Sequence, residues 1–305
     1  MQRFISFLIE TTSKSTFSDE HAFEKMWNHG VDTGSHSYEH LSSEIEKAKK
    51  NPKHPLSFEN SEAEGFTKKD KTAPGARDHY FKELHIAATT IHSLQDHPDF
   101  HAASVNKERA TVAGRSSGVL TPLWKKHSAK NTTSRSDVNI GKSIKMSYKK
   151  HGGSQLASME PNQMKATYEH AADKHMQENK NFTAAHKKQF MKHVTTLASL
   201  MEKGKTLTDD KEREATIQQA EKLRKTMHEK YPGVANHFHR EAAIGEGQFG
   251  SGNAGTATHV VTSANPKTGV ATVKRASDFS SKDVKKTRIS GAKGANRPFP
   301  LRIDI

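Results

Sequence analysis

The sequence has no cysteine among its 305 residues. This absence excludes disulfide bonds, thiolate metal sites, iron–sulfur clusters and cysteine nucleophiles. Apolar residues are scarce as well: 32% of the residues are hydrophobic and 7% aromatic, against roughly 45–50% apolar residues in an ordinary globular chain when glycine is counted. No stretch approaches the roughly 18 consecutive apolar residues of a membrane-spanning helix. The composition predicts a small core and no membrane partner.

Acidic residues are outnumbered by basic ones. The chain has 48 lysines and arginines against 34 aspartates and glutamates, which gives a formal net charge of +14. Its 20 histidines add further positive charge when the pH falls toward their ordinary pKa of about 6.5. Such a charge favours binding to polyanions, so DNA is the expected partner.

The first ten residues differ from the segment that follows them. Phe4, Phe7 and Leu8 recur at helical spacing, whereas residues 11–18 are small and polar. One interpretation is a first helix packed on the core. The decamer also resembles the capsid-targeting peptide of internal head proteins from T-even-type bacteriophages, which a prohead protease removes after a Leu-x-Glu or Ile-x-Glu triplet. Leu8-Ile9-Glu10 matches that triplet.

This resemblance implies a location and a set of partners. The peptide, residues 1–10, would bind the phage capsid scaffold and be cut by the prohead protease after Glu10. The mature protein would begin at Thr11, lie in the virion interior beside DNA, and reach the host cytoplasm after ejection. A host protein is then a further possible partner.

Helical periodicity covers most of the remaining chain. The predicted helices are residues 19–29, 37–50, 76–95 and 161–178, a segment marked by Phe190, Val194, Leu197 and Met201, and residues 208–230. Residues 51–75 contain three prolines and few apolar groups, so a mobile loop is expected there. No element is assigned between residues 97 and 121.

Alternation of apolar and polar residues predicts two hairpins that are distant in sequence. The first covers residues 137–149 with a Gly-Lys turn, and the second joins residues 258–262 to 270–274. The final segment, PFPLRIDI, alternates too and is compatible with an edge strand. The predicted fold class is α+β, mainly helical, with a small mixed sheet built from the two hairpins.

The first hairpin carries the candidate catalytic residues. Asp137 begins one strand, while Ser147 and Lys149 share a face of the next, because strand side chains alternate. A metal-dependent nuclease needs a carboxylate for a hard cation and a lysine near the attacking water and the scissile phosphate. Other residues of the segment could bind the substrate: Lys142, Lys145, Lys150, Gly152, Gly153, Ser154 and Gln155.

The segment resembles the active-site hairpin of PD-(D/E)XK nucleases, in which an aspartate and a turn precede a strand ending in Ser-x-Lys and a Gly-Gly-Ser-Gln tail. The resemblance implies Asp137 as the Mg²⁺ ligand, Lys149 as the catalytic lysine and Gln155 as a substrate-side donor. Ser147 occupies the place of the usual second acid, so Glu83 or Glu160 would have to complete the site. Residues 76–305 would form the nuclease-like domain, after a helical and flexible region at 11–75.

Several alternatives remain open at this stage. The basic hairpin could bind phosphates without any reaction, or the whole chain could act as a DNA-neutralising protein or as an ejected inhibitor of a host defence enzyme. The glycine-rich segment 245–255 could cradle a phosphate or connect two elements. Histidines such as His36 and His40 lack a third ligand at a metal-binding spacing, so solvent-facing side chains are expected instead of a zinc site.

Overall fold

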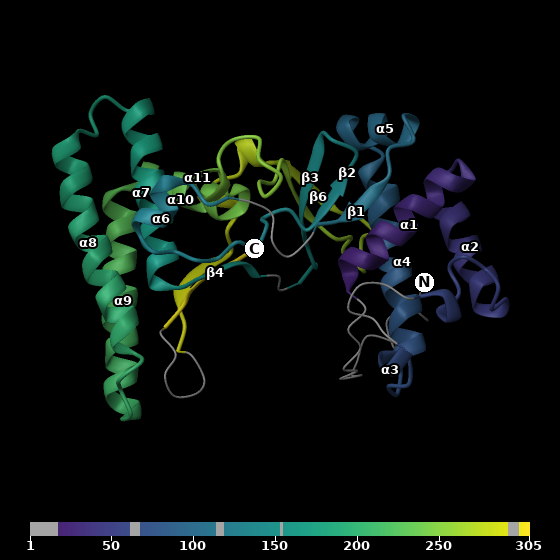
Figure 1. Cartoon of the computed structure of the whole chain (residues 1–305), viewed down its shortest axis with the longest axis horizontal. Coiled ribbons are helices and arrows are strands. Elements are labelled where there is room, and N and C mark those ends of the chain that lie inside the picture. The colour runs from purple at the N-terminus through teal and green to yellow at the C-terminus, as the bar shows by residue number, and fades with distance from the viewer. Residues whose placement is uncertain (1–17, 62–67, 114–118, 153–154, 292–298) are drawn as a thin grey trace. The chain divides into compact units, whose positions relative to one another are not determined.

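The computed structural model describes residues 18–61, 68–113, 119–152, 155–291 and 299–305. The chain divides into two compact units (Figure 1). The first unit comprises residues 1–112 and 263–272, and the second comprises residues 113–262 and 273–305. Among the described residues, no helix is both long enough and apolar enough to cross a bilayer.

The first unit is helical apart from one short strand. Its elements are α1 (Asp19–Thr33), α2 (Tyr38–Lys50), η2 (Phe58–Asn60), α3 (Lys68–Lys71), α4 (Ala76–Leu94), α5 (Pro98–Val105) and β1 (Ala110–Val112). Ser18 begins α1 as an N-cap, because its hydroxyl accepts a hydrogen bond from the backbone N–H of His21. Residues 51–75, expected to form a mobile loop, contain η2 and α3. The segment between residues 97 and 121, to which no element was assigned, contains α5 and β1.

The core of the first unit forms where α4 packs on α1 and α2. Leu84, Ile91 and Leu94 recur on one side of α4 and are fully buried, as the periodicity predicts. The structure therefore groups α4 with the preceding helices. The division expected at residue 75 does not coincide with a boundary between the two units, which lies after residue 112.

The second unit contains most of the strands and the longest helices. Its elements are α6 (Pro122–Lys126), β2 (Val138–Ile140), β3 (Ile144–Lys149), β4 (Gln155–Met159), α7 (Pro161–Glu178), α8 (Ala184–Lys203), α9 (Asp210–Lys230), α10 (Pro232–Ile244), α11 (Glu246–Phe249), β5 (His259–Thr262), β6 (Thr272–Arg275), η3 (Ala276–Asp278), η4 (Ser281–Asp283), β7 (Lys286–Ile289) and β8 (Leu301–Asp304). Strand β6 begins at the last residue of the first unit.

The mixed sheet confirms the predicted fold class. Strands β2 and β3 form an antiparallel hairpin in which Val138 is opposite Met146. Strand β3 is also paired in parallel with β5, so that Ser147 is opposite Val260 and Lys149 is opposite Thr262. Strand β6 follows β5 in the same sheet. The two hairpins therefore meet through a parallel pair of strands, which makes this α+β sheet mixed.

A second sheet of three antiparallel strands was not expected from the sequence. Its order is β4, β8, β7, so the C-terminal segment is a central strand and not an edge strand. Ser158 of β4 and Arg288 of β7 both lie opposite Arg302 of β8. The prediction of an edge strand is wrong because β4 and β7 pair with the two sides of β8, and the alternation in these two partner strands is too short to predict them from the sequence.

Four long helices enclose the main core of the second unit. Helices α7 to α10 pack on one another (Figure 1), and the strands β4, β7 and β8 contribute Met159, Ile289 and Leu301 to the same cluster. Tyr168 of α7 stacks on Phe238 of α10 with ring centroids 3.9 Å apart. This helical core supports the side chains of the candidate sites described next.

Candidate functional site

Asp137 and Lys149 meet at the end of the β2–β3 hairpin opposite its turn. Asp137 directly precedes β2, and its backbone N–H donates to the carbonyl of Met146 at 2.8 Å, which extends the ladder by one residue. Its Oδ2 atom accepts two hydrogen bonds, from Lys149 Nζ at 2.7 Å and from the backbone N–H of Tyr148 at 2.8 Å. The predicted pairing of carboxylate and lysine is thus present in the structure.

The pair is partly exposed and lies near Arg135. The side chains of Asp137 and Lys149 are 24% and 15% exposed, so both remain accessible to a ligand. Arg135 lies close enough for the negative charges of Glu241 and Asp137 to oppose the lowering of its pKa by burial. Within the described residues, Asp137 is the carboxylate that pairs with Lys149, and no other carboxylate forms an ion pair with that ammonium.

The residues considered as a second acid have partners of their own. Glu83 is on α4 in the first unit and is 2% exposed, with His79 Nδ1 3.8 Å from its Oε1. Glu160 is the N-cap residue of α7, where its backbone N–H donates to Gln163 Oε1 at 3.0 Å in a capping box. Ser147, in the position of the usual acid, is 3% exposed. The second unit thus brings together Asp137 and Lys149 alone among the proposed catalytic residues.

The predicted substrate-binding residues have different surroundings. Lys142 lies in the hairpin turn and is exposed, as are Lys150, Gly152 and Gln155. Lys145 instead donates from its ammonium to the backbone carbonyls of Gly252 and Asn253, each at 2.9 Å. Gly153 and Ser154 are outside the described residues, as is the proposed cleavage site at Glu10. Lys145 therefore braces a loop of this unit.

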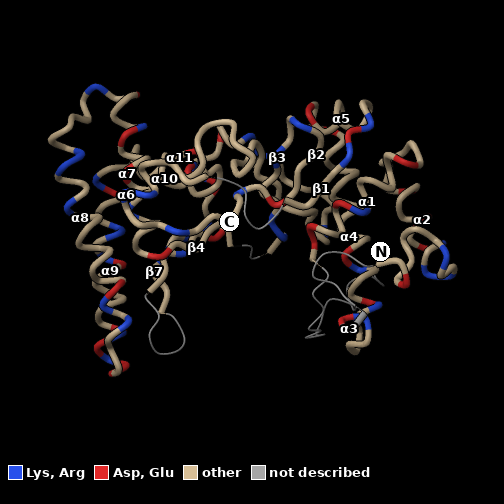
Figure 2. The backbone as a smooth tube through the Cα atoms, viewed as in Figure 1, with Lys and Arg blue, Asp and Glu red and all other residues tan. Residues whose placement is uncertain are grey.

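Positive charge is not concentrated on one recognition element. Figure 2 shows lysines and arginines along most helices and strands of both units, with acidic residues interspersed on the long helices. Such a distribution suits contacts with a phosphate backbone more than base-specific contacts from one helix.

The glycine-rich segment after α10 is largely buried in its first part, at residues 245–249, whereas Ser251, Gly252 and Ala254 are exposed. Glu241 is 4% exposed and accepts hydrogen bonds from the backbone N–H groups of Gly247 and Gln248 at 2.9 and 3.3 Å. Burial raises the pKa of Glu241 to about 7, although these N–H groups and Arg135 act in the opposite direction. The N–H groups of Gly247 and Gln248 are therefore already engaged by Glu241 and are not available to a phosphate.

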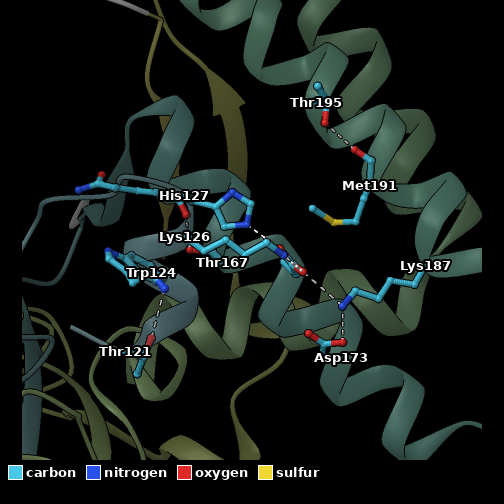
Figure 3. Close-up of polar contacts among 11 residues, drawn as sticks. Thr121, Trp124, Lys126, His127, Thr167, Asp173, Lys187, Met191 and Thr195 are labelled. Atoms are coloured by element: carbon cyan, nitrogen blue, oxygen red, sulfur yellow. Dashed lines mark hydrogen bonds and ion pairs between the residues drawn. The ribbon is translucent and has the colours of Figure 1, made fainter. Parts of the chain in front are cut away.

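A second cluster of charges centres on Glu169 of α7. Lys126 Nζ and His127 Nε2 donate to its carboxylate at 2.7 and 2.6 Å, and Lys187 Nζ lies 3.4 Å from it. Figure 3 shows the side chains of Lys126 and His127 pointing toward that of Lys187, which also reaches Asp173. The cluster ties α6 and α8 to α7, so we assign it a structural role.

One group of side chains in the first unit could hold a metal ion. His29 of α1, Glu44 of α2 and His54 have ligand atoms that all lie within 4.8 Å of one another. Both His29 Nε2 and His54 Nε2 are 3.1 Å from Glu44 Oε2. Because His54 Nδ1 accepts a hydrogen bond from the N–H of Leu56 at 3.1 Å, the neutral ring carries its hydrogen on Nε2.

This tautomer disfavours metal binding through His54 Nε2, since a metal needs the lone pair of that nitrogen. The group is instead a carboxylate that accepts hydrogen bonds from two histidines and from Lys47 at 2.6 Å. The hydrogen bond from Lys47 is the largest of the effects that lower the pKa of Glu44 to about 2. The expectation that His36 faces solvent is wrong, because this side chain is buried against Trp27.

Spacing along the sequence gave no sign of these clusters. Glu44 and Glu169 sit on helices with many charges, and nothing in their neighbourhood distinguishes them from solvated residues. Comparison of the chain with protein-family models, with curated proteins and with solved structures finds no match. The residues themselves therefore carry the functional assignment.

Proposed function

We propose that this chain binds DNA and hydrolyses phosphodiester bonds at the end of the β2–β3 hairpin. The observation that carries the proposal is the contact between Asp137 and Lys149, whose Oδ2 and Nζ atoms are 2.7 Å apart. A carboxylate and an ammonium group held side by side on a rigid hairpin match the needs of metal-assisted phosphodiester hydrolysis.

Each of the two residues has a defined task in this proposal. Lys149, held in place by Asp137, neutralises charge on the scissile phosphate and lies near the attacking water. Asp137 is the protein ligand of Mg²⁺, which supplies a polarised phosphoryl oxygen and an acidified water when it is bound. The backbone N–H of Tyr148 keeps the carboxylate oriented through its 2.8 Å hydrogen bond.

The donor set fits a magnesium ion that depends on its substrate. Mg²⁺ is often held by one or two carboxylates together with substrate phosphates and water. With Asp137 as the one carboxylate beside Lys149 among the described residues, the remaining ligands come from DNA and water. We therefore expect weak Mg²⁺ binding by the protein alone and tighter binding in the presence of DNA.

A non-catalytic DNA-binding function is the second candidate. It is favoured by Ser147, a buried hydroxyl where the nuclease pattern has an acid, and by the net charge of +14. In this alternative, the hairpin binds phosphates and the protein neutralises packaged DNA. A protein that is packaged with DNA and ejected into the host could also inhibit a host defence enzyme.

The proposed setting is the interior of a phage virion, followed by the host cytoplasm after ejection. This part of the proposal rests on the first ten residues, which are outside the described structure. Mass spectrometry of virion material tests it: a mature chain starting at Thr11 supports the capsid-targeting peptide, whereas an intact Met1 contradicts it.

Cleavage assays distinguish the catalytic function from the binding function. The full chain is incubated with supercoiled plasmid and with single-stranded DNA in the presence of Mg²⁺ or Mn²⁺. Cleavage that requires the metal and is lost in Lys149→Met supports the nuclease. Exposed Lys188 on α8 provides the matched control, Lys188→Met, which removes the same charge. Salt-sensitive binding without any cleavage would establish the second candidate instead.

A further inference from the structure

A basic pocket lies in the second unit, away from the residues proposed for catalysis. It has a volume of about 600 Å³ and is bounded by α9, the short turn η4 and strand β7. Its lining contains five lysines and arginines but a single carboxylate, Glu221. The cationic side chains are Arg224, Lys225, Lys285, Lys286 and Arg288.

Most of this charge is not neutralised within the protein. Arg288 pairs with Asp304 through a 3.2 Å contact. By contrast, Lys225, Lys285 and Lys286 form no ion pair with any residue that the structure describes. The pocket therefore offers an excess of positive charge to an anion in solution.

Arg224 is the buried cation of the pocket. The residue is 7% exposed, and its one hydrogen bond among the described residues runs from Nε to Glu221 Oε2 at 2.9 Å. Arg224 lines the pocket, and neither of its terminal nitrogens is sealed from solvent, so their N–H donors are available to a ligand. A guanidinium edge of this kind matches two phosphate oxygens in a bidentate contact.

Glu221 acts as a positioning residue for Arg224. While Oε2 accepts from the guanidinium, Oε1 accepts from the backbone N–H of Ile289 in β7 at 2.5 Å. Both carboxylate oxygens are thus engaged by the protein. The arrangement fixes the plane of the guanidinium and leaves its outer edge for a ligand.

Two neutral histidines, His228 and His239, belong to the pocket wall. Burial is the largest effect that lowers the pKa of His228 to about 3 and that of His239 to about 4, so both rings are uncharged at neutral pH. The hydroxyl of Tyr168 lies 2.7 Å from His228 Nε2, so this ring nitrogen is engaged within the protein. His239 lies between the hydroxyls of Ser281 and Thr287, at 2.8 and 2.9 Å.

A neutral His239 has one donor and one acceptor nitrogen. One of its two hydroxyl partners therefore accepts from the ring and retains its own O–H as a donor. The pocket thus combines a bidentate cation, three lysines and neutral donors. Val284 and Ile289 add a small apolar wall.

We propose that this pocket binds a phosphate ester of nucleotide size, with its phosphate group on the Arg224 guanidinium. The size of the ligand follows from the volume of about 600 Å³, because sites for small organic ligands occupy roughly 300–1,000 Å³. A phosphate ion alone would leave most of that space to water. The proposal is independent of catalysis at Asp137.

Calorimetric titration of the full chain tests the pocket with three probes: deoxyadenosine monophosphate, inorganic phosphate and deoxyadenosine. The nucleotide binds saturably, phosphate competes with it at higher concentration, and the nucleoside does not bind. Arg224→Met weakens nucleotide binding at least about tenfold, since charge-assisted hydrogen bonds are lost. Arg224→Lys, which keeps the charge but not the planar fork, has an intermediate effect.

Two further variants guard against a folding defect in the Arg224 variants. Lys286→Met removes an exposed lysine of the pocket and also weakens nucleotide binding. Lys222 is on α9 with Arg224 but does not line the pocket, so Lys222→Met leaves nucleotide binding unchanged. Circular dichroism melting checks that each variant folds.

Three results would overturn the proposal. The first is no saturable binding of the nucleotide by the wild-type protein. The second is wild-type affinity in both Arg224→Met and Lys286→Met. The third is an effect of these variants on oligonucleotides alone, which would make the pocket part of a DNA-binding surface. Asp137→Asn should retain nucleotide binding, because the pocket is independent of the hairpin site. A loss of cleavage in this variant therefore does not bear on the pocket.

Discussion

The carboxylate of Asp137, the residue before β2, accepts a 2.7 Å hydrogen bond from the ammonium of Lys149, the last residue of β3. A partly buried ammonium group that loses its carboxylate partner keeps its desolvation cost without compensation. The same carboxylate is the one protein group proposed to hold the metal. A substitution that removes the charge of Asp137 should therefore affect hydrolysis of DNA and not the binding of DNA.

Asp137→Asn should abolish cleavage while preserving DNA binding. The amide keeps the shape and can still accept from the Tyr148 N–H, but it carries no charge for Mg²⁺. We expect cleavage to fall by at least about a hundredfold, with DNA affinity unchanged or higher because repulsion of phosphate is lost. Plasmid nicking and fluorescence anisotropy measure the two effects. Asp96→Asn, at an exposed position of the other unit, is the control; equal cleavage by both variants would contradict the proposal.

Ser147→Glu restores the acid that the nuclease pattern expects, at a position that is 3% exposed. Without metal, the added bulk and buried charge should lower the free energy of unfolding by roughly 1–3 kcal/mol. If the introduced carboxylate and Asp137 share a cation, Mg²⁺ raises the melting temperature of this variant far more than that of the wild type. Ser147→Gln has the same size without the charge and should not respond to Mg²⁺. Equal changes of the melting temperature with Mg²⁺ in both variants would show that the side chain at position 147 does not share a cation with Asp137.

The hairpin that carries Asp137 and Lys149 could be predicted from local sequence alone. Alternation fixes which side chains share a face, and the Gly-Lys turn fixes the register, so both residues fall on the same end. The long helices α4, α7, α8 and α9 were predictable for a similar reason, because their periodicity is local.

Long-range pairing could not be read from the sequence in this way. Strand β8 is central because β4 and β7 lie on either side of it; β7 is the preceding element of the chain, but β4 ends before α7, far from β8 in sequence. Arg224 is one of many charges on α9, and its sequence neighbours do not distinguish it from a solvated residue. Its burial depends on η4 and β7, which the chain reaches more than 50 residues later.

The three lysines proposed to bind the substrate, Lys142, Lys145 and Lys150, should contribute unequally to DNA binding. Lys142 and Lys150 are exposed, and replacement of either by glutamine should reduce the slope of log affinity against log salt by about 1 for each lost phosphate contact. Lys145 is engaged by the carbonyls of Gly252 and Asn253. Lys145→Gln should leave the slope unchanged and lower the melting temperature. Titrations at several salt concentrations would disprove this ranking if all three slopes changed alike.

Gly247 leaves room for the ring of His170. A Cβ atom on Gly247 would lie 2.5 Å from His170 Cγ, which is far inside van der Waals contact. Gly247→Ala should therefore lower the free energy of unfolding by roughly 1–3 kcal/mol. A double-mutant cycle in urea identifies the cause: in a His170→Ala background the cost of Gly247→Ala should fall but not vanish, because the Cβ atom of residue 170 stays 2.9 Å from the added methyl group. An undiminished cost without the ring would point to the backbone of α11 instead.

Glu169 should make the stability of the second unit sensitive to acid. Burial raises its pKa, but hydrogen bonds from Lys126 and His127 and the charge of Lys187 outweigh burial and lower the pKa to about 2, from an ordinary 4.5. A carboxyl whose pKa is depressed by folding stabilises the protein above its ordinary pKa, and this contribution fades as the pH falls toward the lowered value.

The test is Glu169→Gln, which keeps the shape and removes the charge. We expect the wild type to exceed this variant in free energy of unfolding most clearly near neutral pH, and the difference to shrink as the pH falls below about 4.5. Urea unfolding at a series of pH values measures it. Glu202→Gln is the matched control, because Glu202 forms an exposed ion pair with Lys205 at 2.7 Å and such pairs contribute little. A difference for Glu169→Gln that stayed constant with pH would show that packing of the side chain, and not its charge, holds α6 and α8 on α7.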